Sequence, residues 1–207
     1  KIKLENLAVC DFDKAKNAEL EGPTIKPYNL SGPRFGVSHM TGMNQDILMS
    51  KDEGGFGKSP SMTVIGYQYE QSYLYTGAVQ AVFQTNFSLT GLDQQMAIPS
   101  LSFLNGFRST KYGWEVGFGP VFRFKKILRG YENENGEWIL KRDDANYQGV
   151  YSDRLDNRGE FVLQPGWIWA VGKTFHAGNM NIPVNVYAIP DNDGWLFGFS
   201  FGYALHR

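Results

Sequence analysis

Large hydrophobic residues and small residues alternate with a period of two along most of the chain from residue 32 onward. The clearest run is 195–205, whose bulky positions are Trp195, Phe197, Phe199, Phe201, Tyr203 and Leu205. The positions between them are mostly glycine, serine and alanine. Because alternate side chains of a β-strand point to opposite faces, this run predicts a strand with one bulky face and one small face.

Segments 112–124 and 161–174 repeat this alternation. In a soluble β-sandwich, the face opposite the core carries Lys, Glu and Thr for contact with water. Here that face is small, which suits the crowded interior of a narrow barrel. The bulky rows are therefore predicted to face outward into lipid. The predicted lipid-facing residues are Phe118, Phe122, Trp167, Trp169, Phe197, Phe199 and Phe201.

Eight such segments follow one another, at 33–41, 61–70, 75–89, 96–107, 112–124, 161–174, 180–190 and 195–205. Most are long enough to cross a bilayer when tilted, which takes roughly 9–11 residues. Long connections, above all 42–60 and 125–160, alternate with short ones, except that residues 191–194 predict a tight hairpin turn where a long connection is due. This asymmetry is typical of outer-membrane barrels. The fold class expected is all-β, a transmembrane antiparallel up-and-down β-barrel of about eight strands.

The alternation of connections also predicts the orientation in the membrane. The long loops would lie outside the cell, and both termini would lie in the periplasm. Residues 1–32 are polar and mixed, and are expected to form a periplasmic tail beside a barrel domain at 33–207. Inside the longest loop, residues 127–132 and 137–142 flank a turn sequence and are expected to form a hairpin.

Five charged residues fall on the small, inward face of the predicted barrel, namely Arg34, Glu70, Arg108, Glu115 and Arg123. An isolated buried charge would cost several kcal/mol. We therefore expect a network of ion pairs that plugs the lumen. A gate or polar binding site is the alternative, but an eight-stranded barrel is barely wide enough for its own side chains.

Composition limits the other function classes. The formal net charge of −1 gives no general electrostatic reason to expect nucleic-acid binding. The single cysteine, Cys10, allows no internal disulfide. No apolar run approaches the 18 or more residues of a transmembrane helix, so a helical membrane protein is excluded.

The chain shows no recognisable catalytic or cofactor-binding motif, so neither an enzyme nor a cofactor is expected. Its histidines, His39, His176 and His206, lie on separate segments without metal-ligand spacing, so no metal site is expected. Acidic residues in the 125–160 loop could collect calcium, but solvated loop acids are far commoner and calcium is not expected there. These loop residues are Asp143, Asp144, Asp153, Asp156 and the neighbouring Asn157.

Several short motifs resemble those of small outer-membrane β-barrel proteins of the Bacteroidota type. They are LSGPRFGV at 30–37, GYQYE at 66–70, IPSL at 98–101, GWEVGFGP at 113–120 and NIPVNV at 181–186. The resemblance covers residues 30–207. It implies barrel architecture and an outer-membrane location in a Gram-negative cell, and it carries no catalytic residues.

The leading hypothesis is a non-enzymatic outer-membrane barrel with a plugged lumen. Its role would be structural or partner-binding, as a subunit of a larger cell-envelope complex, in contact with outer-membrane lipid and envelope proteins. One alternative is a soluble ligand-binding barrel of lipocalin type, which would need its bulky face inward. Another is an outer-membrane lipid-modifying enzyme that uses a serine near a histidine, such as Ser72 with His176.

Overall fold

The computed structural model describes residues 28–51, 54–133, 137–141, 143 and 147–205. The helices of this part are α2 (Met43–Met49) and the short 3-10 helix η1 (Leu92–Gln94). The strands are β1 (Gly32–Met40), β2 (Ser61–Tyr75), β3 (Val79–Thr90), β4 (Ile98–Ser109), β5 (Trp114–Glu132), β6 (Trp138–Leu140), β7 (Ser152–Leu155), β8 (Glu160–Ala177), β9 (Met180–Asp191), β10 (Gly194–Gly202) and β11 (Ala204–Leu205). No helix in this described part has the length and hydropathy of a membrane span.

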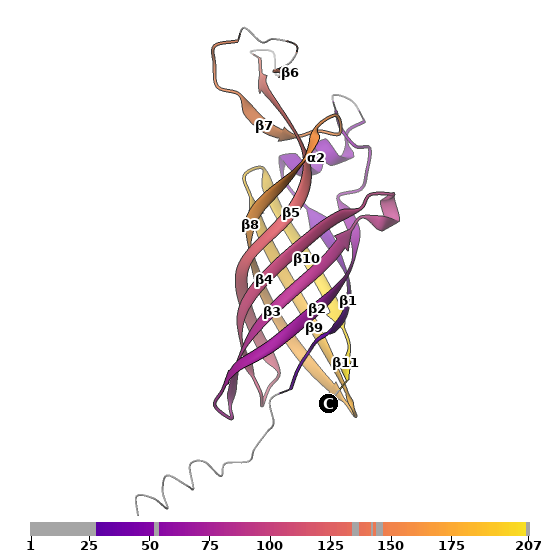
Figure 1. Ribbon diagram of the computed structural model, residues 1–207. Coiled ribbons are helices and arrows are strands. Elements are labelled where there is room, and N and C mark those ends of the chain that lie inside the picture. The colour runs from indigo at the N-terminus through magenta and orange to yellow at the C-terminus, as the bar shows by residue number, and fades with distance from the viewer. Residues whose placement is uncertain (1–27, 52–53, 134–136, 142, 144–146, 206–207) are drawn as a thin grey trace, which may run out of the picture.

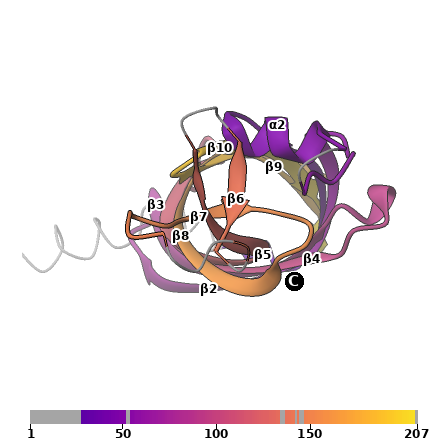
Figure 2. The same ribbon diagram turned by 90° about the horizontal axis from the view of Figure 1, so that it is seen from above.

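Eight long strands form a closed antiparallel ring in the order β1-β2-β3-β4-β5-β8-β9-β10 (Figures 1 and 2). The ring closes where β10 pairs with both β9 and β1, the latter from Arg34↔Gly202 to Met40↔Leu196. After Tyr203 the chain resumes pairing with β9 through β11. The expected all-β, up-and-down barrel of about eight strands is confirmed.

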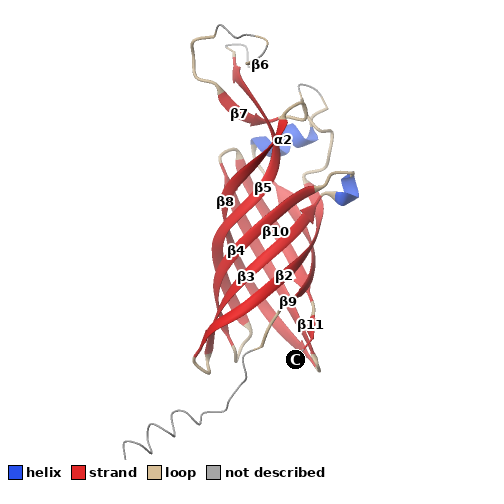
Figure 3. Ribbon diagram, in the orientation of Figure 1, coloured by secondary structure: helices blue, strands red, loops and turns tan. Residues whose placement is uncertain are grey.

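The two ends of the barrel differ. At one end the strands are joined by short turns, and at the other end lie the long connections with both helices (Figure 3). Beyond the ring, β5 continues and pairs with β7 and then with β6, so that these strands project above the barrel (Figure 1). The expected hairpin is thus present as the pairing of β5 with β6, although its turn residues 134–136 lie outside the described part.

Outward and inward faces follow the alternation in the sequence. Each of the eight ring strands carries exposed large hydrophobic side chains, such as Phe35 on β1 and Phe107 on β4. The inward positions are buried or half-buried, and glycine serves where neighbouring backbones come close. A Cβ on Gly119, for example, would clash with the backbone carbonyl of Phe103 on β4.

The predicted boundary between tail and barrel needs correction. Residues 28–31 were expected to lie outside the barrel, but the side chains of Tyr28 and Leu30 are buried and pack with Ala204. Their backbone bonds to lumen side chains, because the Leu30 amide donates to Glu70 Oε1 at 3.1 Å and the Tyr28 carbonyl accepts from Gln80 at 3.0 Å. The barrel unit therefore includes these residues. Residues 1–27 of the predicted tail lie outside the described part.

Candidate functional site: the barrel lumen

The lumen at the short-turn end holds a buried ionic cluster centred on Arg108, whose side chain has no exposure to solvent. Its guanidinium donates to Glu70 through two nitrogens, one at 2.7 Å, and to Glu115 through Nε at 2.6 Å. It also donates to the Tyr28 carbonyl at 3.3 Å. One arginine on β4 thus ties together carboxylates from β2 and β5 and the segment that precedes β1.

Amide side chains satisfy the remaining carboxylate oxygens. Gln84 Nε2 lies 3.1 Å from Glu70 Oε2 and 2.7 Å from Glu115 Oε1, and Gln68 Nε2 donates to Glu70 Oε2 at 3.1 Å. Buried polar groups that are fully hydrogen-bonded avoid most of the desolvation cost of burial. The cluster therefore fills this end of the lumen with a connected polar layer. The glutamines are residues that the sequence analysis missed, although they share the inward phase of Glu70.

An apolar layer lies in the middle of the lumen. Leu104, Val121, Ile168, Ile189 and Leu196 form a buried cluster, with Tyr187 packed against it. Tyr187 passes so close to Gly198 that a Cβ there would overlap its ring. This apolar layer lies between the ionic cluster and the opposite end of the lumen, beside a cavity of about 100 Å³ that Ser88 and Ser100 also line. Eight-stranded barrels commonly have interiors filled by side chains in this way.

A second charged cluster lies near the long-loop end. Asp191 accepts hydrogen bonds from Arg123 at 3.2 Å and from Lys125, and Gln164 Nε2 lies 3.4 Å from its other oxygen. Asp191 also escaped the sequence analysis, which assigned it only to a hairpin turn. Its inward phase on β9, shared with Ile189, is the signal that could have revealed it.

The five predicted network residues are all buried, but the structure does not bring them into one network. Glu70, Arg108 and Glu115 are joined directly, and Arg34 lies close enough to interact electrostatically with both glutamates while it donates to the Leu30 carbonyl. Arg123 belongs to the separate Asp191 cluster. The reason is distance along β5, because eight residues separate Arg123 from Glu115 and a strand rises roughly 3.3 Å per residue.

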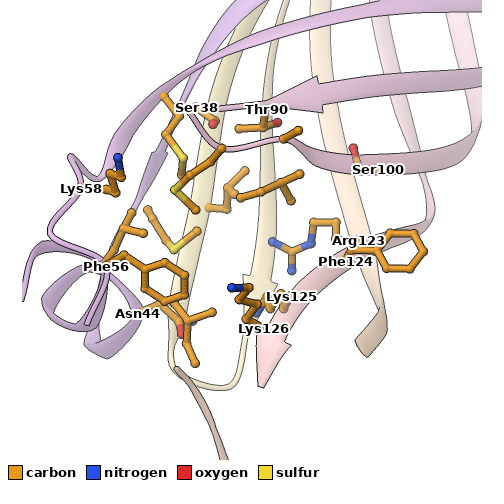
Figure 4. Close-up of a pocket in the computed structure, with 18 of the residues that line it drawn as sticks. Ser38, Asn44, Phe56, Lys58, Thr90, Ser100, Arg123, Phe124, Lys125 and Lys126 are labelled. Carbon is orange, nitrogen blue, oxygen red and sulfur yellow. The ribbon is translucent and has the colours of Figure 1, made fainter. Parts of the chain in front are cut away.

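Above the apolar layer, a cavity of about 350 Å³ opens at the long-loop end (Figure 4). Its walls combine methionine and aliphatic side chains with Lys58, Arg123, Lys125 and Lys126. Strands, α2 and the loop that contains η1 all contribute to it. The sequence analysis did not predict this cavity, because its walls come from segments far apart in the chain.

The residues of the enzyme alternative are not paired. The Ser72 hydroxyl donates to the Ala81 carbonyl, and His176 Nδ1 lies 2.6 Å from Asn181 Oδ1. No hydrogen bond among the described residues joins Ser72 to His176. Likewise, within the part of the chain that the structure describes, no group of three or more acidic, histidine or cysteine side chains could hold a metal ion.

Two acids of the long loop, Asp153 and Asp156, have cationic partners. Asp153 accepts two hydrogen bonds from Arg129, the shorter at 2.8 Å, and these bonds hold the pKa of that carboxyl below its ordinary value. Asp156 is paired with Arg158 at 2.7 Å. Asp144 lies outside the described residues. The first pair joins β5 to β7, and the second lies within one short segment.

Comparison with known proteins adds a structural likeness. No protein-family model and no curated protein matches the chain. Among solved structures, the chain is similar to Ail, the attachment invasion locus protein of Yersinia pestis, crystallised with the heparin analogue sucrose octasulfate. The likeness covers 87% of this chain and 100% of Ail, at 11% sequence identity and a TM-score of 0.30. Nothing about function follows from a likeness at this level, and the resemblance to Bacteroidota-type barrels stays a prediction.

Proposed function

We propose that this protein is a non-enzymatic outer-membrane β-barrel with a plugged lumen and a structural or partner-binding role in the cell envelope. The observation that supports the proposal most strongly is the continuous outward display of aromatic and aliphatic side chains around the ring. Trp169 and Trp167 are 57% and 54% exposed, although they lie in the middle of β8. Soluble proteins rarely leave an apolar surface of this extent in water.

All seven side chains predicted to face lipid point outward. Phe122 is half-buried between its neighbours, while Phe118, Trp167, Trp169, Phe197, Phe199 and Phe201 are exposed. Aromatic residues also lie at strand ends, where membrane interfaces favour them; Lys173 reaches over the Trp114 ring at 5.1 Å. A lipocalin-like barrel needs the opposite arrangement, with the bulky rows around an internal cavity.

The two lumen clusters and the apolar layer between them support a plugged barrel over a pore.

The long loops support partner binding. Because long loops of outer-membrane barrels are typically extracellular, we place the long-loop end outside the cell and the termini in the periplasm. In the projecting part, Tyr131 and Tyr147 stack with ring centroids 3.5 Å apart, and Tyr151 packs against both rings. Tyrosine is enriched at the centres of protein interfaces. We infer that this projection meets another envelope component.

Quenching of tryptophan fluorescence by lipid brominated in mid-chain tests the membrane assignment. A variant that retains only Trp169 is compared with one that retains only Trp138 on the projecting β6. Reconstituted in brominated phosphatidylcholine, the Trp169 variant is expected to lose most of its emission and the Trp138 variant to keep it. A protein that remains dissolved in buffer without detergent, with neither tryptophan quenched, would overturn the proposal.

The partner-binding role needs a separate experiment. Wild-type protein and a variant with residues 133–151 replaced by a short Gly-Ser linker are purified from native membranes in mild detergent, and co-purifying proteins are identified by mass spectrometry. The proposal expects at least one envelope protein at stoichiometric yield with the wild type and its loss with the variant. Identical sets for both proteins would exclude the projection as the contact.

A further inference from the structure

The mouth cavity, defined as the 350 Å³ space above the apolar layer, has the size of a small-molecule site, at the lower end of the usual range. Its apolar wall includes Met40, Met62 and Met96, together with Leu196 and Ile98. Methionine side chains are flexible and polarisable, and they adapt to irregular apolar ligands. This wall suits a single alkyl chain and is too small for a lipid with several chains.

Two polar groups in the wall have no partner. Arg123 is 7% exposed and Ser38 is 2% exposed, and among the described residues neither Arg123 Nε nor the Ser38 hydroxyl has a hydrogen-bond partner. Both side chains lie in the cavity wall in Figure 4. A buried donor without an acceptor costs about 1–3 kcal/mol. A ligand that brought a hydrogen-bond acceptor to either donor would remove this cost.

The charge of the wall is one-sided. Among the described residues that line the cavity are Lys58, Arg123, Lys125 and Lys126, and none of the lining residues is Asp or Glu. Asp191, just outside the lining, contacts Arg123 and Lys125, and Asp193 also acts electrostatically on Lys125. Lys126 Nζ lies 3.2 Å from the Asn157 carbonyl and 3.3 Å from its side-chain oxygen, both of which are neutral acceptors. The wall keeps a positive excess that favours an anion.

Beside the cavity, the pairing of β4 with β5 stops short and leaves a gap in the backbone ladder. Their pairing ends at Ser100↔Arg123, whereas β3 pairs with β4 as far as Thr90↔Ile98 and β5 pairs with β8 as far as Ile127↔Glu160. The lining accordingly includes inward residues of β5 and also the outward-facing Phe124. An elongated ligand could enter through this gap from the side or through the loops from above.

From these observations we propose that the mouth cavity binds a single-chain anionic amphiphile. The alkyl chain packs against the methionines, and the carboxylate or phosphate headgroup accepts hydrogen bonds from Arg123 and ion pairs with Lys58 and Lys126. The proposal does not rest on a partner-binding role. Its failure would leave the membrane assignment intact.

Binding of radiolabelled dodecanoate is measured by equilibrium dialysis with the full chain in phosphatidylcholine nanodiscs, after subtraction of empty nanodiscs. Wild type is expected to bind one dodecanoate per chain saturably. Lys58→Gln/Lys126→Gln is expected to weaken binding at least about tenfold, since hydrogen bonds to charged groups contribute that much each. Arg123 is left unchanged because its loss would also disturb Asp191. The matched control, Lys111→Gln/Lys141→Gln, removes the same charge outside the cavity and should bind like wild type.

Two further probes separate headgroup recognition from simple partition. Dodecanol, which has the same chain and no charge, is expected to compete at least about tenfold more weakly than unlabelled dodecanoate. Met96→Trp fills the cavity from the loop side and is expected to abolish binding while the unheated protein keeps the gel mobility of the folded barrel. Equal binding by the two lysine double variants, or equal competition by dodecanol, would overturn the proposal.

The source of the ligand is decided in a second arm. Nanodiscs receive lysophosphatidylglycerol as their sole anionic lipid, and lipid retained by the released protein is counted by native mass spectrometry. Retention by wild type that is lost in Met96→Trp and in Lys58→Gln/Lys126→Gln would assign the ligand to the bilayer and support entry through the gap. Binding of dodecanoate without such retention would assign it to the aqueous side. If neither Met96→Trp nor Lys58→Gln/Lys126→Gln changed dodecanoate binding or lysophosphatidylglycerol retention, the site would be refuted.

Discussion

Replacing Arg108 by methionine is expected to remove about 3–5 kcal/mol from the free energy of unfolding, the usual cost of breaking a buried ion pair from one side. The guanidinium is fully buried and serves Glu70 and Glu115 together. Methionine fills similar space but leaves two buried carboxylates with Arg34 as the nearby cation. The loss therefore comes mainly from uncompensated charge, and only slightly from packing.

This reasoning makes a second, opposite prediction for a double variant. Arg108→Met/Glu70→Gln leaves Glu115 and Arg34, so the formal charge of the cluster is balanced again. We expect the double variant to recover about half of the stability lost by the single variant, because the unpaired-charge term dominates. A purely steric role for Arg108 would instead make the double variant no more stable than the single one.

Urea unfolding in lipid vesicles, followed by tryptophan fluorescence and by the gel mobility of unheated samples, measures both effects. With an m-value of about 2 kcal/mol/M, a loss of 4 kcal/mol shifts the midpoint down by about 2 M. Arg129→Met is the control, since its exposed pair with Asp153 should leave the barrel midpoint almost unchanged. A midpoint for Arg108→Met equal to that of wild type would refute the stabilising role of the cluster.

Three other predictions follow from separate features. Gly119→Ala should lower the free energy of unfolding by about 1–3 kcal/mol, because the new Cβ would clash with the Phe103 carbonyl. Gly117→Ala should lower it clearly less, because the nearest atom to its Cβ belongs to Leu104 at 3.4 Å. Equal midpoints of the two variants in urea would contradict this prediction. The orientation of the barrel can be tested on intact cells with a membrane-impermeant maleimide in a Cys10→Ser background. The maleimide should label Val150→Cys, because Val150 is 89% exposed on the long loop, and should leave Lys111→Cys at a short turn unlabelled. The reverse labelling pattern would show the opposite orientation. The native pKa of Asp153 lies below its unfolded value, so its bond to Arg129 stabilises the projection above about pH 4 and this stabilisation is lost as the pH falls through the native pKa. Arg129→Gln should raise the pKa of Asp153 toward about 3.9, as measured by a carboxyl ¹³C NMR titration. An unchanged pKa would exclude the pair as the cause.

Strand positions could be predicted closely because the period-two pattern is local. The segments expected at 33–41 and 180–190 correspond to β1 (Gly32–Met40) and β9 (Met180–Asp191). The larger differences occur where pairing extends beyond the alternating run, as in β2, which continues to Tyr75 because β3 is long enough to pair with it. Ladder length depends on the partner strand, so one segment cannot reveal it.

The contents of the lumen were predicted less completely. Arg34, Glu70, Arg108, Glu115 and Arg123 share the inward phase and are buried, but phase does not give height along the barrel axis. Height depends on strand tilt and on the register between neighbours, which together set which inward residues share a level. For this reason Arg123 meets Asp191 of β9 and not Glu115 of its own strand.

The sequence by itself determined that the chain forms a barrel and which side chains face outward, because alternation with a period of two is fixed within each strand by backbone geometry. Only the tertiary structure decided the entry of residues 28–31 into the lumen, the division of the inward charges into two clusters and the cavity at the mouth. Each of these depends on contacts between segments distant in sequence. Ring closure and stagger bring such segments together, and neither is encoded in any single strand.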